Sequence, residues 1–243
     1  MSGLLEVDGL TKRFGGVTAV NDCSFSVPDH SITALVGPNG SGKTTAFNLI
    51  TGYARADAGS VRFRGAALRR PDPVRLARRG LTRTFQQARI FPELTLVENL
   101  VAALQQPWRA LFRPAVRAAE RVRALELLEE FGLARLAGER AGELSYGQKK
   151  LLEFATVLMG EPQLVLLDEP TAGVNPVLVE QIEARIRDLH GQGLAFLVVE
   201  HNLNLVMRLC DPVVVLDHGA KLAEGPPDLV RSDPRVLDAY LGG

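Results

Sequence analysis

The segment Gly37-Pro38-Asn39-Gly40-Ser41-Gly42-Lys43-Thr44 fits the pattern Gly-x-x-x-x-Gly-Lys-[Ser/Thr]. The apolar run Ile32–Val36 before it is typical of a strand, and a helical stretch follows it as far as Gly52. Glycines leave room for backbone N–H groups to wrap phosphates, and a helix N-terminus adds partial positive charge. The segment therefore predicts a phosphate-binding loop, and the alternative is a glycine-rich helix start without a ligand.

The last two residues of this loop carry its side-chain chemistry. The ammonium group of Lys43 is expected to supply a point charge to the β- and γ-phosphates of a nucleotide. The hydroxyl group of Thr44 is expected to supply an oxygen to Mg²⁺.

Acidic residues end a second apolar run and complete a candidate hydrolytic site. Residues 164–167 are Leu-Val-Leu-Leu, and Asp168 and Glu169 follow at the carboxyl edge of the expected sheet, where ligands bind. We expect Asp168 to orient Mg²⁺-bound water and Glu169 to be the general base for the attacking water. The alternative is an acidic pair that only caps a strand.

A third apolar run ends at an equivalent edge. Residues 196–199 are followed by Glu200 and His201. His201 is a candidate contact for the γ-phosphate or for the attacking water. A lone histidine at a strand end is more often structural.

The apolar runs also predict the fold class. Residues 164–167, 196–199 and 213–216 are continuously apolar, and residues 31–36 are apolar apart from Ser31 and Thr33, as strands buried on both faces of a parallel sheet require. A crossover helix is expected after Pro176, because Leu178, Ile182, Ile186 and Leu189 share one helical face. Residues 4–7, 24–27 and 61–63 alternate, which predicts a flanking antiparallel layer. The class is α/β.

The middle of the chain has a helical pattern without a strand, and we interpret residues 87–160 as a helical subdomain. One helix is expected to bury Ala118, Val122, Leu125 and Leu128 and to stop at Gly132. An irregular link around Trp108 and Phe112 lies before it. The predicted division is 1–86 for the phosphate-loop core with the antiparallel layer, 87–160, and 161–243 for the rest of the α/β core, within one domain.

A second anion-ready helix start lies in the helical subdomain, at Glu143-Leu144-Ser145-Tyr146-Gly147-Gln148. Ser145 is a natural N-cap, and Gly147 permits close approach of a ligand. Since the first loop already holds a nucleotide, we predict that this segment engages a nucleotide held by another subunit. The alternative is an ordinary capped helix.

Composition narrows the function classes. The 243 residues carry 28 Lys+Arg and 28 Asp+Glu, and this balance disfavours a surface built for nucleic acid. The longest apolar run has six residues, well short of the ~20 that cross a bilayer. No secretory signal is evident, and the isolated Cys23 and Cys210 suit a reducing compartment.

The charge balance is uneven along the chain. Nine arginines and one acid, Asp72, lie between Arg62 and Arg89. We interpret this stretch as a solvated basic face, with contact to anionic headgroups or to a membrane subunit as the alternatives.

Five elements stand in one order: 37–45, Gln86, 144–148, 164–169 and His201. Together they resemble the ATP-binding subunit of an ABC transporter, over essentially the whole chain. The resemblance implies an ATPase of the P-loop NTPase class that uses ATP and Mg²⁺. It also implies that Thr45 joins the nucleotide contacts, that adenine stacks on Phe14 and that Gln86 contacts Mg²⁺ and water.

The same resemblance implies how two subunits cooperate. Ser145 and Gly147, with Gln148 beside them, would contact the γ-phosphate held by the opposite subunit, and residues 172–175 would cross between the subunits.

Finer motifs are similar to those of bacterial importers for branched-chain amino acids. They are Arg13-Phe14-Gly15-Gly16, Arg83-Thr84-Phe85-Gln86, Tyr146, Ala172-Gly173-Val174-Asn175-Pro176, Glu200-His201-Asn202 and Ala239-Tyr240-Leu241-Gly242. This implies a second ABC ATPase subunit as partner, identical or related, and transmembrane permease subunits. It places the chain peripherally at the cytoplasmic face of the cell membrane.

Two alternatives stay open. The cargo can be another amino acid, an amide or lipopolysaccharide, because the ATPase need not touch it. A soluble ABC ATPase that acts on nucleic acid or ribosomes is the rival from another class. Such proteins usually carry two cassettes, a long coiled coil or a basic tail, which are not visible in this sequence.

Overall fold

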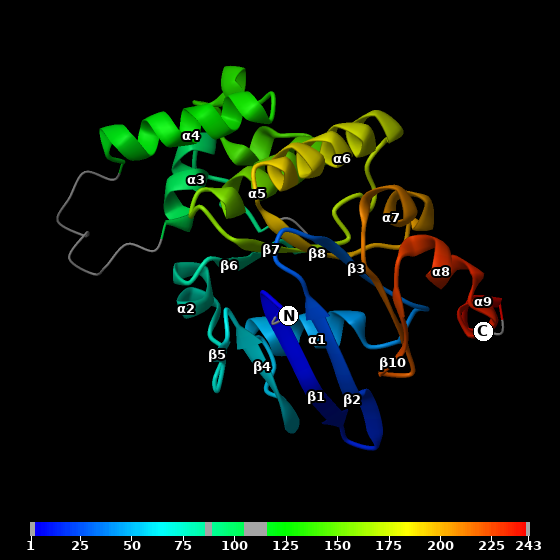
Figure 1. Cartoon of the computed structure of the whole chain (residues 1–243). Helices are drawn as coiled ribbons and strands as arrows, with labels where there is room; N and C mark the ends of the chain where they lie inside the picture. Colours follow the sequence, from blue (N-terminus) through cyan, green and yellow to red (C-terminus); the bar gives the residue numbers. More distant parts are fainter. Residues whose placement is uncertain (1–2, 86–88, 105–115, 242–243) are drawn as a thin grey trace.

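The structure is a computed structural model that describes residues 3–85, 89–104 and 116–241 (Figure 1). Its central sheet has the strand order β10-β9-β3-β8-β7-β6. All strands of this sheet run parallel except β10, which pairs antiparallel with β9. The strands are β3 (Ile32–Val36), β6 (Leu81–Arg83), β7 (Leu164–Asp168), β8 (Ala195–Val199), β9 (Val213–Asp217) and β10 (Ala220–Gly225).

The inner strands β9, β3, β8 and β7 of the central sheet are buried on both faces, which explains their largely apolar sequences. On β7, Leu164 and Leu166 belong to one core cluster, and Val165 and Leu167 belong to another. Since neighbouring side chains of a strand point to opposite faces, each cluster lies on its own side of the sheet. The predicted parallel α/β core is confirmed.

A second, antiparallel sheet has the order β2-β1-β4-β5. Its strands are β1 (Leu5–Phe14), β2 (Val17–Val27), β4 (Ala58–Phe63) and β5 (Ala66–Ala67). Helix α1 (Lys43–Thr51) packs its Phe47 and Ile50 into the core that both sheets share. The predicted strands were too short, because bulges and exposed polar residues interrupt the alternation in the outer parts of β1 and β2.

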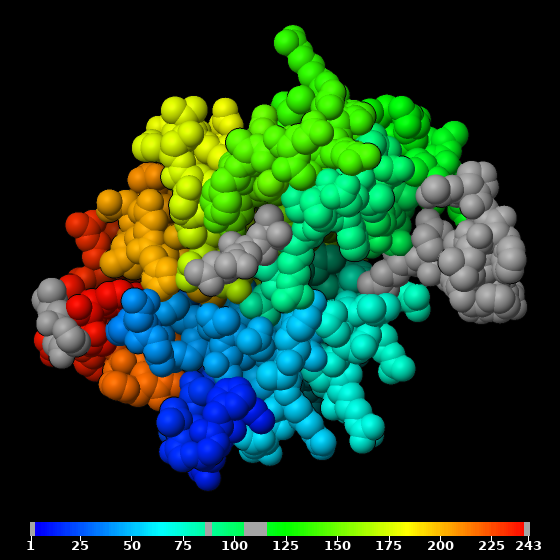
Figure 2. Space-filling model, turned by 180° about the vertical axis from the view of Figure 1, so that it is seen from behind, coloured from blue at the N-terminus to red at the C-terminus, as the bar shows by residue number. Residues whose placement is uncertain are grey.

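The helices of the middle of the chain, green in Figure 2, lie above the N-terminal sheet, which is blue and cyan. This helical segment contains α3 (Leu96–Ala103), α4 (Ala118–Glu130) and α5 (Tyr146–Leu158). The predicted buried face of α4 was wrong at Ala118 and Val122, which are exposed, whereas Leu128 is buried and Leu125 is half-buried against the core as expected. The buried stripe is Ala124, Leu127 and Leu128, which packs against α3 and α5. Val122 lies two and five residues from this stripe and therefore faces away from it.

The remaining helices cover the central sheet and continue to the C-terminus. The predicted crossover helix is α6 (Pro176–Gly191), with Pro176 in its first turn and Ile182, Ile186 and Leu189 buried. The others are α2 (Pro73–Arg78), α7 (Leu203–Leu209), α8 (Pro227–Ser232) and α9 (Pro234–Leu241). Short 3₁₀ turns lie at Ala134–Leu136 and Ala141–Glu143.

The described part of the chain contains no helix with the length and apolarity that a membrane crossing needs. Strands from the predicted segments 1–86 and 161–243 pair within the central sheet. The boundaries at 86 and 160 stay predictions.

The core side chain that joins the sheet to the helical segment is Phe196 on β8. It is fully buried, and its ring meets that of Phe154 on α5 edge-to-face at 6.5 Å between centroids. We predict that Phe196→Ala lowers the free energy of unfolding by about 3–5 kcal/mol, through lost burial and the cavity left behind. Urea unfolding measures this loss.

The matched control is Phe91→Ala, because the Phe91 side chain is 58% exposed. It should change the same free energy by no more than about 0.5 kcal/mol. Equal losses in the two variants would contradict the packing described for β8.

Candidate functional site

The phosphate loop links β3 to α1 through backbone that only glycine adopts without strain. Gly37, Gly40 and Gly42 have φ values of 150°, 80° and 99°. A Cβ on Gly37 would lie 2.1 Å from the carbonyl oxygen of Leu216, and one on Gly42 would lie 2.3 Å from that of Ala19. A Cβ on Gly40 would enter open space. The loop is therefore closely held at both ends and open in the middle, where an anion would lie.

Lys43 crosses back over this loop. Its Nζ donates to the carbonyl oxygens of Gly37 and Pro38, each at 2.8 Å. Burial lowers the pKa of Lys43, and the nearby Glu169 carboxylate opposes that shift. Thr44 is exposed and Thr45 is half-buried in the first turn of α1. A cation and the N-terminus of α1 thus lie together at the loop, which fits the phosphate groups of ATP.

The predicted base lies at the end of β7, as expected. Glu169 has φ 49°, and its N–H donates to the carbonyl oxygen of Val199 on β8 at 2.9 Å. Its Oε1 lies 2.8 Å from Nε2 of His201. The structure therefore brings Glu169 and His201 together, although they are 32 residues apart in the chain.

Glu200 fixes the two loops that carry this pair, a role the sequence did not reveal. It is buried, and its Oε2 accepts a 2.7 Å hydrogen bond from the hydroxyl of Thr171. Its Oε1 accepts a 2.9 Å hydrogen bond from the backbone N–H of His201. The Glu200 carboxylate thus connects Thr171, in the loop after Glu169, to the backbone of His201.

Asp168 is buried and paired, and this corrects the interpretation of the arginine-rich stretch. Arg83 donates from Nη2 to Oδ2 of Asp168 at 2.7 Å, and the two side chains are 5% and 6% exposed. The arginine of this stretch nearest to the carboxylate is therefore not part of a solvated face. Arg62, Arg64 and Arg78 are exposed as predicted.

The second helix start is a complete capping box at the beginning of α5. The hydroxyl of Ser145 accepts from the N–H of Gln148 at 3.3 Å, and Oε1 of Gln148 accepts from the N–H of Ser145 at 2.9 Å. Tyr146 donates from its hydroxyl to the carbonyl oxygen of Ala172 at 3.3 Å. A Cβ on Gly147 would lie 2.5 Å from Cδ2 of Leu178, so here this glycine accommodates a side chain of α6.

The two remaining site predictions have different outcomes. Phe14 lies at the end of β1 with 53% of its surface exposed, and Nζ of Lys12 lies 5.3 Å from its ring centroid. Its ring is thus accessible to a flat partner, and its contact with adenine stays a prediction. Gln86 lies outside the described residues.

Glu153 on α5 holds the backbone on both sides of residues 86–88. Its Oε1 accepts from the N–H of Phe85 at 2.9 Å and from that of Arg89 at 3.4 Å. Burial raises the pKa of Glu153 to about 7, which these hydrogen bonds and Lys150 partly oppose. No sequence pattern singles out this carboxylate, because it lies among the apolar positions of a helix.

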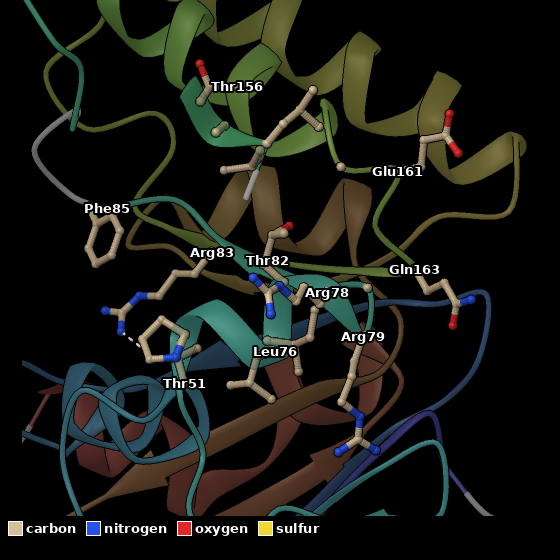
Figure 3. A pocket seen from close by; sticks show the side chains of 18 of the residues that line it. Thr51, Leu76, Arg78, Arg79, Thr82, Arg83, Phe85, Thr156, Glu161 and Gln163 are labelled. Carbon is tan, nitrogen blue, oxygen red and sulfur yellow. Dashed lines mark hydrogen bonds between the residues drawn. The ribbon is translucent and has the colours of Figure 1, made fainter. Parts of the chain in front are cut away.

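A pocket of about 860 Å³ opens beside Phe85, between α2, β6 and the ends of α3 and α5 (Figure 3). Arg64, Arg78, Arg79 and Arg83 line it, and Glu161 is the acidic residue among its described lining. Phe85 contributes an aromatic wall, and its ring meets that of Tyr53 edge-to-face. The pocket is thus basic with an apolar side.

We predict that Glu153 makes stability depend on pH between about 4.5 and 7. In that window the folded chain keeps a proton on Glu153 that the unfolded chain has lost, so the free energy of unfolding falls as pH rises and then levels. Glu153→Gln keeps an acceptor oxygen but does not titrate. Its free energy of unfolding minus that of the wild type should therefore increase from pH 5 to 7.

Denaturant unfolding at several pH values measures this difference. Glu129→Gln, which changes an exposed carboxylate on α4, is the control and should give a flat difference. A flat difference for Glu153→Gln would contradict the assignment.

Comparisons with known proteins agree with this geometry. Residues 20–172 match the ABC transporter family, and residues 220–243 match the family described as branched-chain amino acid ATP-binding cassette transporter. The high-affinity branched-chain amino acid transport ATP-binding protein BraF of Pseudomonas aeruginosa is 41% identical, over 98% of each chain. The corresponding protein LivG of Escherichia coli is 38% identical over the same shares.

Solved structures are similar as well. The ADP conformation of an ATP-binding cassette of an ABC transporter superposes with a TM-score of 0.89 at 35% identity, over 100% of both chains. A dimeric cassette in a post-hydrolysis state bound to ADP and Pi superposes with a TM-score of 0.79 at 25% identity, over 92% of this chain and 98% of that one. This chain belongs to the ATP-binding subunits of ABC transporters, and it is an ATPase.

Proposed function

We propose that this chain powers an importer for branched-chain amino acids, as one of two ATPase subunits that close on Mg-ATP at the cytoplasmic face of the cell membrane. The proposed cargo is supported by the match of residues 220–243 to the branched-chain amino acid family and by relatives that align over 98% of the chain. The proposed pair is made of two copies or of this chain and a related one.

The phosphate loop and the end of β7 provide groups that fit Mg²⁺. Thr44 and Asp168 offer hard oxygen ligands, which Mg²⁺ prefers, directly or through water. When bound, Mg²⁺ neutralises phosphate charge and orders water. Lys43 already faces the loop carbonyls, so it can move its charge to a phosphate oxygen over a short distance.

Glu169 is the proposed general base. Its carboxylate receives the proton of the attacking water, and the bonds of its backbone to β8 fix where that carboxylate stands. His201 contacts Oε1 of Glu169 and so orients the carboxylate. Gln86 is proposed to contact the same water and Mg²⁺.

Ser145 is proposed to complete the site of the partner subunit. It is exposed on the helical segment, and its hydroxyl oxygen accepts from Gln148. A hydroxyl that accepts one bond still has a hydrogen to donate, and the N-terminus of α5 adds partial positive charge. These groups suit the γ-phosphate of an ATP held by the other subunit.

The basic pocket beside Phe85 is the proposed docking surface for a permease. Its arginines favour an acidic segment, and its aromatic wall favours an apolar one. An amphipathic cytoplasmic helix with a carboxylate matches both properties. Docking there would place the membrane subunit beside the segment that Glu153 holds.

The cargo is tested on the assembled transporter. The tagged chain is purified with its membrane partners, reconstituted in liposomes with the cognate binding protein, and assayed for ATP-driven uptake. Leucine, isoleucine and valine should be taken up, and they should stimulate ATP hydrolysis. Uptake of glutamine, an amide or lipopolysaccharide in their place would contradict the proposed cargo.

We predict that Glu169→Gln lowers phosphate release by about 10²–10⁴-fold, because it removes the proton acceptor. The variant should still bind ATP, and it should form ATP-dependent dimers with its ATPase partner that light scattering detects. Unchanged turnover would remove Glu169 as the base.

The control for this prediction is Glu129→Gln on α4, which leaves the site intact. It should hydrolyse ATP at the wild-type rate and show no ATP-stabilised dimer.

A further inference from the structure

Arg83 makes a set of contacts that no role described so far requires. It ends β6, the edge strand of the central sheet. Its Nη2 donates to Oδ2 of Asp168 at 2.7 Å, and its Nη1 donates to Oδ1 of Asn48 at 2.8 Å and to Oγ1 of Thr51 at 3.1 Å. The guanidinium thus ties the acidic end of β7 to the helix that follows the phosphate loop.

Aromatic rings hold the guanidinium from several sides. Its Cζ lies 5.3 Å from the ring centroid of Phe47, 5.9 Å from that of Tyr53 and 5.1 Å from that of Phe85. Contacts of this kind favour a cation over the ring face and limit its rotation. The position of the charge is therefore set by α1, by β7 and by the loops that carry Tyr53 and Phe85, and not by the edge strand alone.

The pair determines the orientation of Asp168. A buried carboxylate is costly unless it is paired and hydrogen-bonded, and Arg83 meets this need through Oδ2. The backbone N–H of Asp168 donates to Oγ1 of Thr84, the neighbour of Arg83, at 3.2 Å. The side chain and the backbone of Asp168 are thus held by Arg83, the last residue of β6, and by Thr84, which follows it.

We propose that Arg83 is a positioning residue that orients the Asp168 carboxylate for Mg²⁺ and connects it to the wall of the basic pocket. Figure 3 shows Arg83 between Phe85 and Thr51 on that wall. A partner that fills the pocket therefore touches the residue that holds the metal carboxylate. This inference rests on the proposed role of Asp168 at Mg²⁺.

The test measures Mg²⁺ dependence of ADP binding to the full chain by calorimetry, without turnover. Arg83→Met should raise the half-saturating Mg²⁺ concentration by about tenfold, as is typical when a group that orients a metal ligand is lost. In EDTA, its affinity for ADP should stay within about twofold of the wild type. Arg83→Lys keeps the charge but not the forked donor, so it should give an intermediate value.

The matched control is Arg185→Met. Arg185 pairs with Glu130, its Cζ lies 5.3 Å from the ring centroid of Phe131, and its Nε, like that of Arg83, has no hydrogen-bond partner among the described residues. Its loss should leave the Mg²⁺ dependence unchanged. The control thus separates the general effect of losing a packed, ion-paired arginine from the specific effect of losing Arg83.

The following results decide the inference. An unchanged half-saturating Mg²⁺ concentration in Arg83→Met overturns the inference. A loss of ADP affinity in EDTA as large as the loss measured with Mg²⁺ overturns it as well. If Arg83→Met does not fold, Arg83→Lys decides by the same criterion. If the wild type binds ADP without any Mg²⁺ dependence, the proposed metal role of Asp168 fails instead, and that outcome is read from the wild type alone.

Discussion

The site depends on the close packing of the phosphate-loop backbone against strands of the two sheets. The start of the loop presses on the end of β9, and its end presses on β2, at separations that leave no space for a side chain. The loop therefore packs against the central sheet at its start and against the antiparallel N-terminal sheet at its end. Because α1 is buried in the core shared by these sheets, its N-terminus has a fixed direction. That fixed direction holds Lys43 within electrostatic range of Glu169, the residue that follows β7.

Acidic side chains gather at the carboxyl edge of the central sheet, and a buried lysine of α5 lies within electrostatic range of them. Lys150 on α5 is buried, and burial lowers its pKa while Glu153, Asp168, Glu169 and Glu200 oppose that shift. Lys150 also donates to the carbonyl oxygen of Phe85 at 3.4 Å. The helix that starts at Ser145 is thus linked electrostatically to the acidic edge. A rotation of α5 would move the positive charge of Lys150 relative to Asp168, Glu169 and Glu200, whereas Glu153 would move with it.

Sequence reasoning reached the residues whose pattern is local. The loop 37–44 and the acids that follow 164–167 were placed correctly, because a glycine spacing and an apolar run both act through nearby backbone. The contacts of Arg83 and Glu153 were missed, because their partners lie 85 and 68 residues away in the chain. A charged residue in a basic run or in a helix looks solvated until the fold shows what covers it. The face of α4 was missed for a related reason, since its small Ala124 belongs to the buried stripe.

The shared nucleotide site is tested most directly by a structure of the chain with its ATPase partner, Mg²⁺ and a non-hydrolysable ATP analogue. The account predicts that Lys43 of one protomer and the Ser145 loop of the opposite protomer, or its equivalent in a related chain, both contact the γ-phosphate. A structure in which every protein contact to that phosphate comes from a single polypeptide would contradict it.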